Sequence, residues 1–122
     1  MARILVVDDE YQIRLSIRTV LKKAGYDVTE ALDGEECVAR FREHPFDLVV
    51  LDIMLPKKDG LEVIQDLVQE FPDVKIITIS GAEQVGKVHL LPESVQLGAL
   101  RAVAKPFNPS FLLSVVQECL SE

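Results

Sequence analysis

Several features that mark common protein classes are missing from this chain of 122 residues. It has only two cysteines, Cys37 and Cys119, which are far apart and in no metal-ligand spacing, so neither a disulfide nor a cysteine metal site is expected. No apolar run reaches the ~18 residues that a membrane helix needs, and the N-terminus turns acidic too soon for a signal peptide. These absences predict a cytoplasmic protein with no membrane contact.

Basic charge is also scarce. The chain has 13 Lys and Arg against 20 Asp and Glu, which gives a formal net charge of −7. Non-specific nucleic-acid binding depends on basic residues that neutralise phosphates, so we expect no direct nucleic-acid binding. Hydrophobic residues make up 48% of the chain, which excludes a disordered acidic tail, and the length suits a single domain over residues 1–122.

Short apolar runs alternate with stretches that have apolar residues at helical spacing. The runs predict strands at 3–8, 26–31, 46–52, 74–79 and 100–104. Helices are expected at 10–24, at 34–43, around 61–71 and from Pro109 onwards, with Gly25 ending the first helix and Asp33 and Asn108 as N-caps. This alternation predicts an α/β fold: a doubly wound, five-stranded parallel sheet of order 2-1-3-4-5, as in flavodoxin-like proteins.

Polar residues stand at the carboxyl ends of these predicted strands. Asp8 and Asp9 follow the first strand, Asp52 ends the third, Ser80 follows the fourth and Lys105 follows the fifth. In an open parallel sheet the strand ends on either side of the switch point lie next to each other, so these groups should meet at one edge. Clustered carboxylates are stable with a hard cation such as Mg²⁺, and a metal with an ammonium attracts an anionic phosphoryl group. Asp52 is then the candidate acceptor of an aspartyl-phosphate.

The sequence resembles the response regulator receiver domains of two-component signalling, the CheY-like superfamily. The resemblance covers essentially all of residues 1–122, and four motifs carry it in order: VVDDE at 6–10, DLVVLDIMLPKKDG at 47–60, IITIS at 76–80 and KPF at 105–107. It implies a phosphoacceptor domain that is phosphorylated by a sensor histidine kinase or a phosphotransfer protein. The changed surface would then signal to a downstream protein or effector domain. Such a domain is no enzyme in the ordinary sense, because it catalyses only its own phosphorylation and dephosphorylation.

The resemblance also implies roles for individual residues. Asp52 would accept the phosphoryl group, Asp9 would bind Mg²⁺ directly and Asp8 would bind it through water. The backbone carbonyl of Met54 would be the remaining metal ligand, with Asp52 itself. Ser80 would hydrogen-bond the phosphoryl group and Lys105 would pair with it. Pro56 and Gly60 would shape the loop after the acceptor, and Lys105–Pro106 would be a cis peptide.

Three departures from the family pattern stand out. Ala102 occupies the position three residues before the lysine, where the family usually has an aromatic switch residue. The stretch from Ser80 to Gly98 is longer than expected, and Pro92 interrupts it, which predicts an irregular fourth-helix region: a loop to about Leu91 and then a short helix, with Val88, Leu90 and Leu91 partly exposed. Met54 and Ala82 cannot orient an attacking water molecule, so slow loss of phosphate is expected.

Other interpretations remain open at this stage. Asp8 and Asp9 could be a helix N-cap and a first-turn acid, and Lys105 a solvated lysine. An aspartate-dependent phosphohydrolase is disfavoured because Met54 stands where its second acid would be. A nucleotide-binding module is disfavoured because DDEYQIR, rather than a glycine-rich loop, follows the first strand. The more serious alternative is a degenerate receiver that acts as a phosphorylation-independent interaction module.

Overall fold

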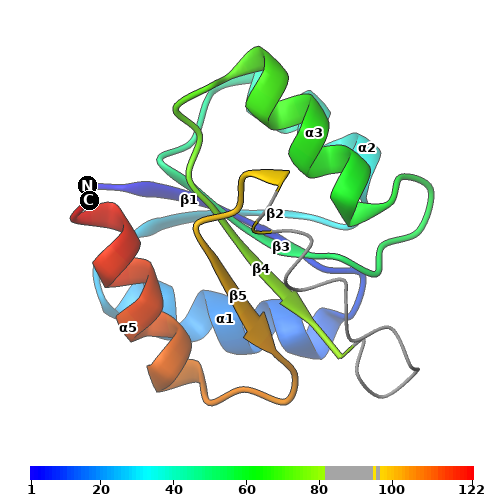
Figure 1. Ribbon diagram of the computed structural model, residues 1–122. Helices are drawn as coiled ribbons and strands as arrows, with labels where there is room; N and C mark the ends of the chain where they lie inside the picture. Colours follow the sequence, from blue (N-terminus) through cyan, green and yellow to red (C-terminus); the bar gives the residue numbers. More distant parts are fainter. Residues whose placement is uncertain (82–94, 96) are drawn as a thin grey trace.

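A five-stranded parallel β-sheet forms the centre of the molecule (Figure 1). The computed structural model describes residues 1–81, 95 and 97–122. The strand order is β2-β1-β3-β4-β5, and every neighbouring pair is parallel, as predicted. The strands are β1 (Arg3–Val7), β2 (Asp27–Ala31), β3 (Leu48–Asp52), β4 (Ile76–Ser80) and β5 (Arg101–Ala104).

Helices cover both faces of this sheet. In Figure 1, α2 and α3 lie on one face, and α1 and α5 lie on the other. Their bounds are α1 (Tyr11–Lys23), α2 (Gly34–Glu43), α3 (Gly60–Glu70) and α5 (Pro109–Leu120). The predicted doubly wound α/β fold is therefore confirmed.

The helix ends follow from local sequence chemistry. The Asp33 side chain accepts a hydrogen bond from the backbone N–H of Glu36 at the start of α2, and Asn108 accepts one from Ser110 at the start of α5. Gly25 follows α1 with φ +96°, a conformation that residues with a Cβ avoid. Most predicted boundaries are correct to within one or two residues. The third strand, predicted from Phe46, begins two residues later at Leu48, because Phe46 is buried but lies outside β3.

Alternating side chains of the strands build two separate cores. Leu5, Val7, Val49 and Leu51 pack with residues of α2 and α3, whereas their sequence neighbours pack with residues of α1 and α5. This second cluster includes Ile4, Val6, Leu48, Val50, Ile77 and Ile79 from the strands. All five residues of β3 are buried, which is expected of a central strand covered on both faces.

The irregular fourth-helix region was predicted mainly on residues 82–94 and 96, which lie outside the described part of the chain, as do Ala82, Val88, Leu90 and Leu91. Among the described residues, no helix has the length and apolar character needed to cross a membrane.

Candidate functional site

The carboxyl ends of four neighbouring strands bring the predicted site residues together. Asp8 follows β1, Asp52 is the last residue of β3, Ser80 is the last residue of β4 and Lys105 follows β5. Asp8 and Ser80 have no exposed surface, and Asp52 is 2% exposed. The topology thus places two buried carboxylates and a hydroxyl at one end of the sheet.

Lys105 joins the two buried carboxylates. Its Nζ lies 3.1 Å from Oδ2 of Asp8 and 3.3 Å from Oδ2 of Asp52, and Oε1 of Glu10 is 3.7 Å away. The backbone N–H of Lys105 donates to the carbonyl of Ser80 at 2.8 Å, which continues the β4–β5 pairing. The Lys105–Pro106 peptide is cis, as the resemblance implied. Lys105 is not a solvated lysine: its side chain is only 16% exposed.

Burial and neighbouring charges shift the pKa values of Asp52 and Lys105. Burial and the neighbouring Asp8 charge raise the pKa of Asp52 from 3.8 to about 6, although Lys105 and the Met54 backbone N–H oppose the shift. Burial lowers the pKa of Lys105, but Asp52 and Asp8 outweigh this and the net shift is upward. At neutral pH Lys105 therefore carries an ammonium and Asp52 is mainly ionised.

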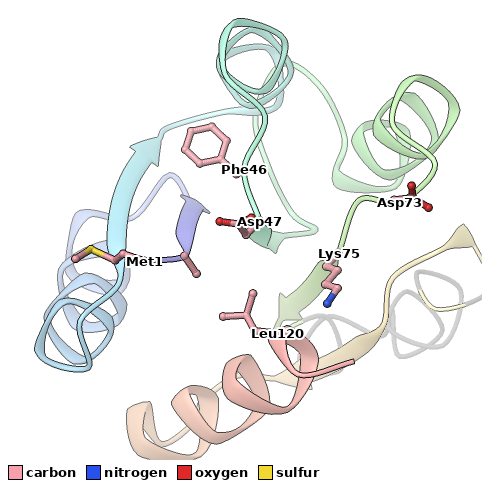
Figure 2. Close-up of a pocket in the computed structure, with 7 residues that line it drawn as sticks. Met1, Phe46, Asp47, Asp73, Lys75 and Leu120 are labelled. Carbon is pink, nitrogen blue, oxygen red and sulfur yellow. The ribbon is translucent and has the colours of Figure 1, made fainter.

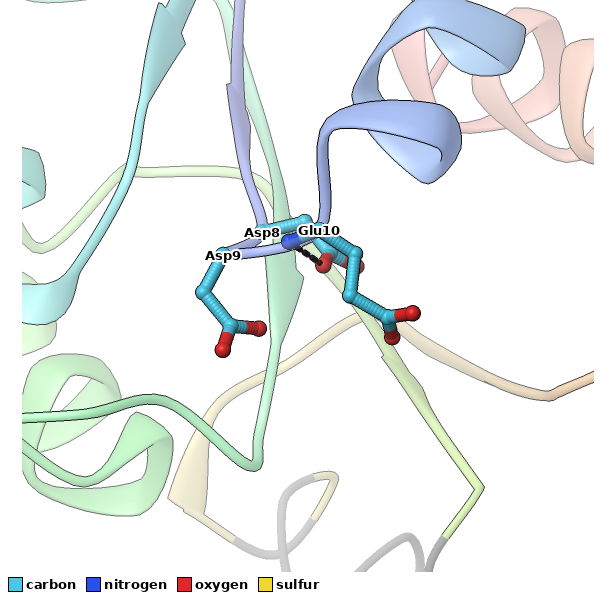
Figure 3. Close-up of side chains that lie close together, drawn as sticks. All are labelled: Asp8, Asp9 and Glu10. Carbon is cyan, nitrogen blue, oxygen red and sulfur yellow. Dashed lines mark hydrogen bonds between the residues drawn. The ribbon is translucent and has the colours of Figure 1, made fainter.

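Three consecutive acids that follow β1 form a candidate cation site next to Lys105. Asp8, Asp9 and Glu10 each offer one carboxylate oxygen, and these atoms lie within 4.8 Å of one another. Figure 3 shows the three side chains on the same side of the loop, with the N–H of Glu10 donating to Oδ1 of Asp8 at 2.9 Å. The Lys105 ammonium contacts the carboxylates of Asp8, Glu10 and Asp52, so this single cation faces more than one acid. An all-oxygen donor set of this charge fits Mg²⁺.

Asp8 and Asp9 do not cap α1. Glu10 occupies the N-cap position without a side-chain cap, and no acid lies in the first turn. The capping interpretation is therefore wrong here. Asp59, by contrast, does cap α3, because its side chain accepts a hydrogen bond from the backbone N–H of Leu61.

The remaining predicted residues surround the acceptor. Met54 is 42% exposed, and its backbone N–H donates to Oδ1 of Asp52 at 3.1 Å. Gly60 follows the same loop and donates its N–H to the carbonyl of Ile53 at 2.9 Å. A Cβ on Gly60 would come within 2.5 Å of Ile53 Cα, so only glycine fits this closely packed turn.

Sequence reasoning missed two residues of this region. Glu10 was part of the VVDDE motif but was given no role, although it is the third acid of the run. Arg14 is only 8% exposed, and its Nη1 donates to the backbone carbonyl of Asp8 at 2.8 Å. The signal was available, because Arg14 stands three and seven residues before Ile17 and Leu21, on the buried face of α1.

A surface pocket of about 530 Å³ lies at the opposite ends of the strands (Figure 2). Its lining includes Asp47 and Lys75, which precede β3 and β4. The ammonium of Lys75 donates to the carbonyls of Cys119 and Glu122 at 2.9 and 2.8 Å, and so holds the end of α5. None of the predicted site residues contributes to this pocket.

Comparison with known proteins identifies the family. The family model for the response regulator receiver domain matches residues 4–117. The chain is 44% identical over 119 residues to a probable transcriptional regulator, ycf27, from Porphyridium aerugineum, covering 97% of this chain and 48% of that protein. It is 32% identical over 117 residues to the chemotaxis protein CheY from Thermotoga maritima, covering 95% of each. The chain thus spans about half the length of the ycf27 relative and nearly all of the CheY relative.

Solved structures agree with the sequence comparison. A CheY-like response regulator receiver domain protein from Methanospirillum hungatei superimposes with a TM-score of 0.89 at 31% identity, covering 99% of this chain and 94% of that one. The receiver domain of NtrX from Brucella abortus gives 0.89 at 30% identity, covering 97% and 98%. With the fold, the match over residues 4–117 and these relatives in agreement, the chain belongs to the response regulator receiver domain family of two-component signalling.

Proposed function

We propose that this domain is a phosphoacceptor switch in which Asp52 receives a phosphoryl group from a sensor histidine kinase or a phosphotransfer protein. The observation that carries the proposal is the position of the Lys105 ammonium, within 3.3 Å of both buried carboxylates at the carboxyl end of the sheet. Phosphoryl transfer needs positioning and charge neutralisation more than covalent chemistry, and this arrangement supplies both.

The proposed step forms an acyl phosphate. A carboxylate oxygen of Asp52 forms the new P–O bond while the P–N bond of the donor phosphohistidine breaks. The electron pair of that bond leaves on the imidazole nitrogen, which then takes up a proton from water. Because the pKa of Asp52 is about 6, the side chain is mainly the nucleophilic carboxylate at neutral pH. The domain catalyses only this step and the later hydrolysis of the acyl phosphate to the free carboxylate and inorganic phosphate.

The other residues of the site have supporting roles in this proposal. Asp9, Asp52 and the Met54 carbonyl would hold Mg²⁺ directly and Asp8 would hold it through water, and the cluster of Asp8, Asp9 and Glu10 adds Glu10 as a neighbouring acid. When bound, Mg²⁺ neutralises charge on the phosphoryl oxygens. Lys105 exchanges its contact with the Asp52 carboxylate for one with the phosphoryl group, and the Ser80 hydroxyl donates to the same group.

The output is a changed surface that a downstream protein or an effector domain recognises. A phosphoryl group adds about two negative charges and three acceptor oxygens, and these bias an existing equilibrium between two surface conformations. We expect no direct contact between this domain and nucleic acid.

One observation favours a second candidate, a degenerate receiver that binds its partner without phosphorylation. Ala102 lies opposite Thr78 in the β4–β5 pairing, and its methyl group is too small to act as the aromatic switch of the family. Under this alternative Asp52 would not be phosphorylated and the domain would bind its partner constitutively.

The test is phosphorylation by acetyl phosphate with Mg²⁺, followed by intact mass. The wild-type protein should gain one phosphoryl group, and Asp52→Asn should gain none. Lys105→Met should slow the gain by roughly 100-fold, the cost typical of losing a preorganised charge-stabilising group. Lys22→Met, which removes a lysine from the end of α1, serves as the matched control and should behave as the wild type. An unchanged mass in the wild-type protein, with both acetyl phosphate and a phosphohistidine donor, would favour the degenerate receiver.

A further inference from the structure

We propose that Arg14 is a positioning residue that holds Asp8 by its main chain and thereby sets the Mg²⁺ affinity of the acidic loop 8–10. This inference rests on the proposed function, because it concerns the same cation site. The first turn of α1 acts on this loop through the buried guanidinium of Arg14, which would contact neither the metal nor the phosphoryl group.

Arg14 is held from three sides. Its Nη1 donates to the Asp8 carbonyl at 2.8 Å, and its Nε donates to Oε1 of Glu30 at 3.0 Å. The ring of Tyr11 lies against the guanidinium, with 5.7 Å between the ring centroid and Cζ. With its side chain only 10% exposed, Arg14 has little freedom to adopt another position.

Glu30 anchors this arginine to the sheet. It belongs to β2, which pairs with β1 along its length, and its second oxygen accepts from Nη1 of Arg18 at 2.7 Å. Although burial opposes it, the two arginines keep the pKa of Glu30 below its ordinary value, so the anchor is ionised at neutral pH. The link from Asp8 through Arg14 to Glu30 thus ties the start of the loop to the neighbouring strand.

All three oxygen atoms of Asp8 consequently accept a contact. The backbone carbonyl contacts Arg14, Oδ1 accepts from the N–H of Glu10, and Oδ2 contacts Lys105. Lys105 is the contact that a phosphoryl group would compete for, whereas the Arg14 contact lies on the backbone and persists when Lys105 moves. Groups that orient metal ligands in this way commonly affect metal affinity as strongly as some ligands do.

Lysine cannot replace this arginine. The contacts to Asp8 and Glu30 use two different nitrogens of one planar group, which a single ammonium cannot reproduce with the same geometry. Arg18 offers a matched control, because it bonds the same Glu30 but has no described contact with Asp8.

The experiment compares Arg14→Lys with Arg18→Lys by Mg²⁺ titration of ¹⁵N-labelled protein, following the amide signals of Asp9 and Glu10 without a phosphodonor. Arg14→Lys should weaken Mg²⁺ binding by about 10-fold, the lower end for loss of an outer contact. Arg18→Lys should stay close to the wild type. Phosphorylation by acetyl phosphate gives a second readout: Arg14→Lys should need more Mg²⁺, but should approach the wild-type rate once Mg²⁺ is saturating.

Equal Mg²⁺ affinities for Arg14→Lys and Arg18→Lys would overturn the inference, and so would a rate defect in Arg14→Lys that saturating Mg²⁺ does not repair. If Arg14→Lys does not fold, as judged by its amide spectrum, Glu30→Gln takes its place and should weaken Mg²⁺ binding while leaving Arg14 present. Because the titration contains no phosphodonor, the outcomes separate. A wild-type protein that takes no phosphoryl group refutes the proposed function, whereas the affinity difference between the two lysine variants decides the role of Arg14.

Discussion

Lys105 and Asp52, 53 residues apart in the chain, are paired across the mouth of the sheet, with 3.3 Å between Nζ and Oδ2. The same ammonium lies 3.1 Å from Asp8, so one cation is shared between two buried carboxylates. The shared ammonium does not fully offset burial and the neighbouring Asp8 charge, which together raise the pKa of Asp52. The ionised Asp52 therefore destabilises the folded protein, and a bound cation or a neutral side chain at this position would remove that destabilisation.

Asp52→Asn should stabilise the protein in the absence of metal. The pKa of Asp52 is about 6 in the fold and 3.8 ordinarily, so folding disfavours the ionised form by roughly 1–3 kcal/mol at neutral pH. Urea unfolding in EDTA at pH 7.5 should show this gain, and the difference should shrink as the pH falls below about 6 because the wild-type carboxyl is then protonated. Asp73→Asn, at an exposed aspartate, is the control and should change little. A less stable Asp52→Asn protein would contradict this electrostatic account.

Glu30→Gln should make stability less dependent on pH. The pKa of Glu30 is depressed below its ordinary 4.5 by Arg18 and Arg14, despite opposing burial. Its charge therefore contributes stability that is fully present above about pH 5 and is lost as the pH falls through the lower, folded pKa. Unfolding curves from pH 7 to pH 3 should show wild type more stable than the variant at pH 7, by about 1 kcal/mol, and the two converging in acid. Parallel curves over the whole range would count against the ion pairs.

Phosphorylated protein should lose its phosphoryl group slowly. The exposed thioether of Met54 beside Asp52 has no group that orients a water molecule for attack. We expect a half-life of minutes or longer by intact mass after removal of the donor. Met54→Asn, which introduces an amide, should shorten it, and Met54→Leu should not. A wild-type half-life of seconds would refute the prediction.

Gly60→Ala should be destabilising and should also disturb the acceptor. The added Cβ would lie 2.5 Å from Ile53 Cα and 2.9 Å from the backbone oxygen of Asp52, so the loop must shift. A loss of about 2–3 kcal/mol is expected from this overpacking, measured by urea unfolding, together with slower phosphorylation. Gly25→Ala is the comparison: its Cβ meets nothing within 4 Å, but φ is +96°, so it should cost about 1–2 kcal/mol without affecting phosphorylation. Identical phosphorylation rates in the two variants would contradict the loop argument.

The sheet and its helices could be predicted because the apolar runs, the helix caps and the turn glycine all indicate the same elements. Apolar runs such as LVVLD at 48–52 have the length and β-branched content of buried strands. Asp33, Asn108 and Gly25 mark helix ends, the first two by side-chain hydrogen bonds and Gly25 by its backbone freedom. Strand order then places Asp8 and Asp52 together at the carboxyl ends of the adjacent strands β1 and β3, and the long side chain of Lys105 reaches both from the end of β5. Boundaries were less accurate, because residues such as Phe46 are buried by packing without belonging to the ladder.

The details of the site could not be read from the sequence in the same way. That Asp8 is buried while Asp9 and Glu10 are exposed depends on how the loop turns after β1, which the run DDE does not encode. The Arg14 contact depends on a guanidinium reaching a backbone carbonyl six residues earlier, and no residue pattern specifies a carbonyl as partner. Its burial, however, could have been inferred from its spacing with Ile17 and Leu21.

The two outer strands of the sheet carry charged residues. In the described part of the chain, β2 and β5 are the outer strands, and parallel edges with unpaired backbone groups can recruit strands from other molecules. Both carry charge: Asp27 and Glu30 lie on β2, and exposed Arg101 lies on β5. Adding a further strand at either side would bury or crowd these charges. These charges therefore disfavour edge-to-edge pairing with a second molecule.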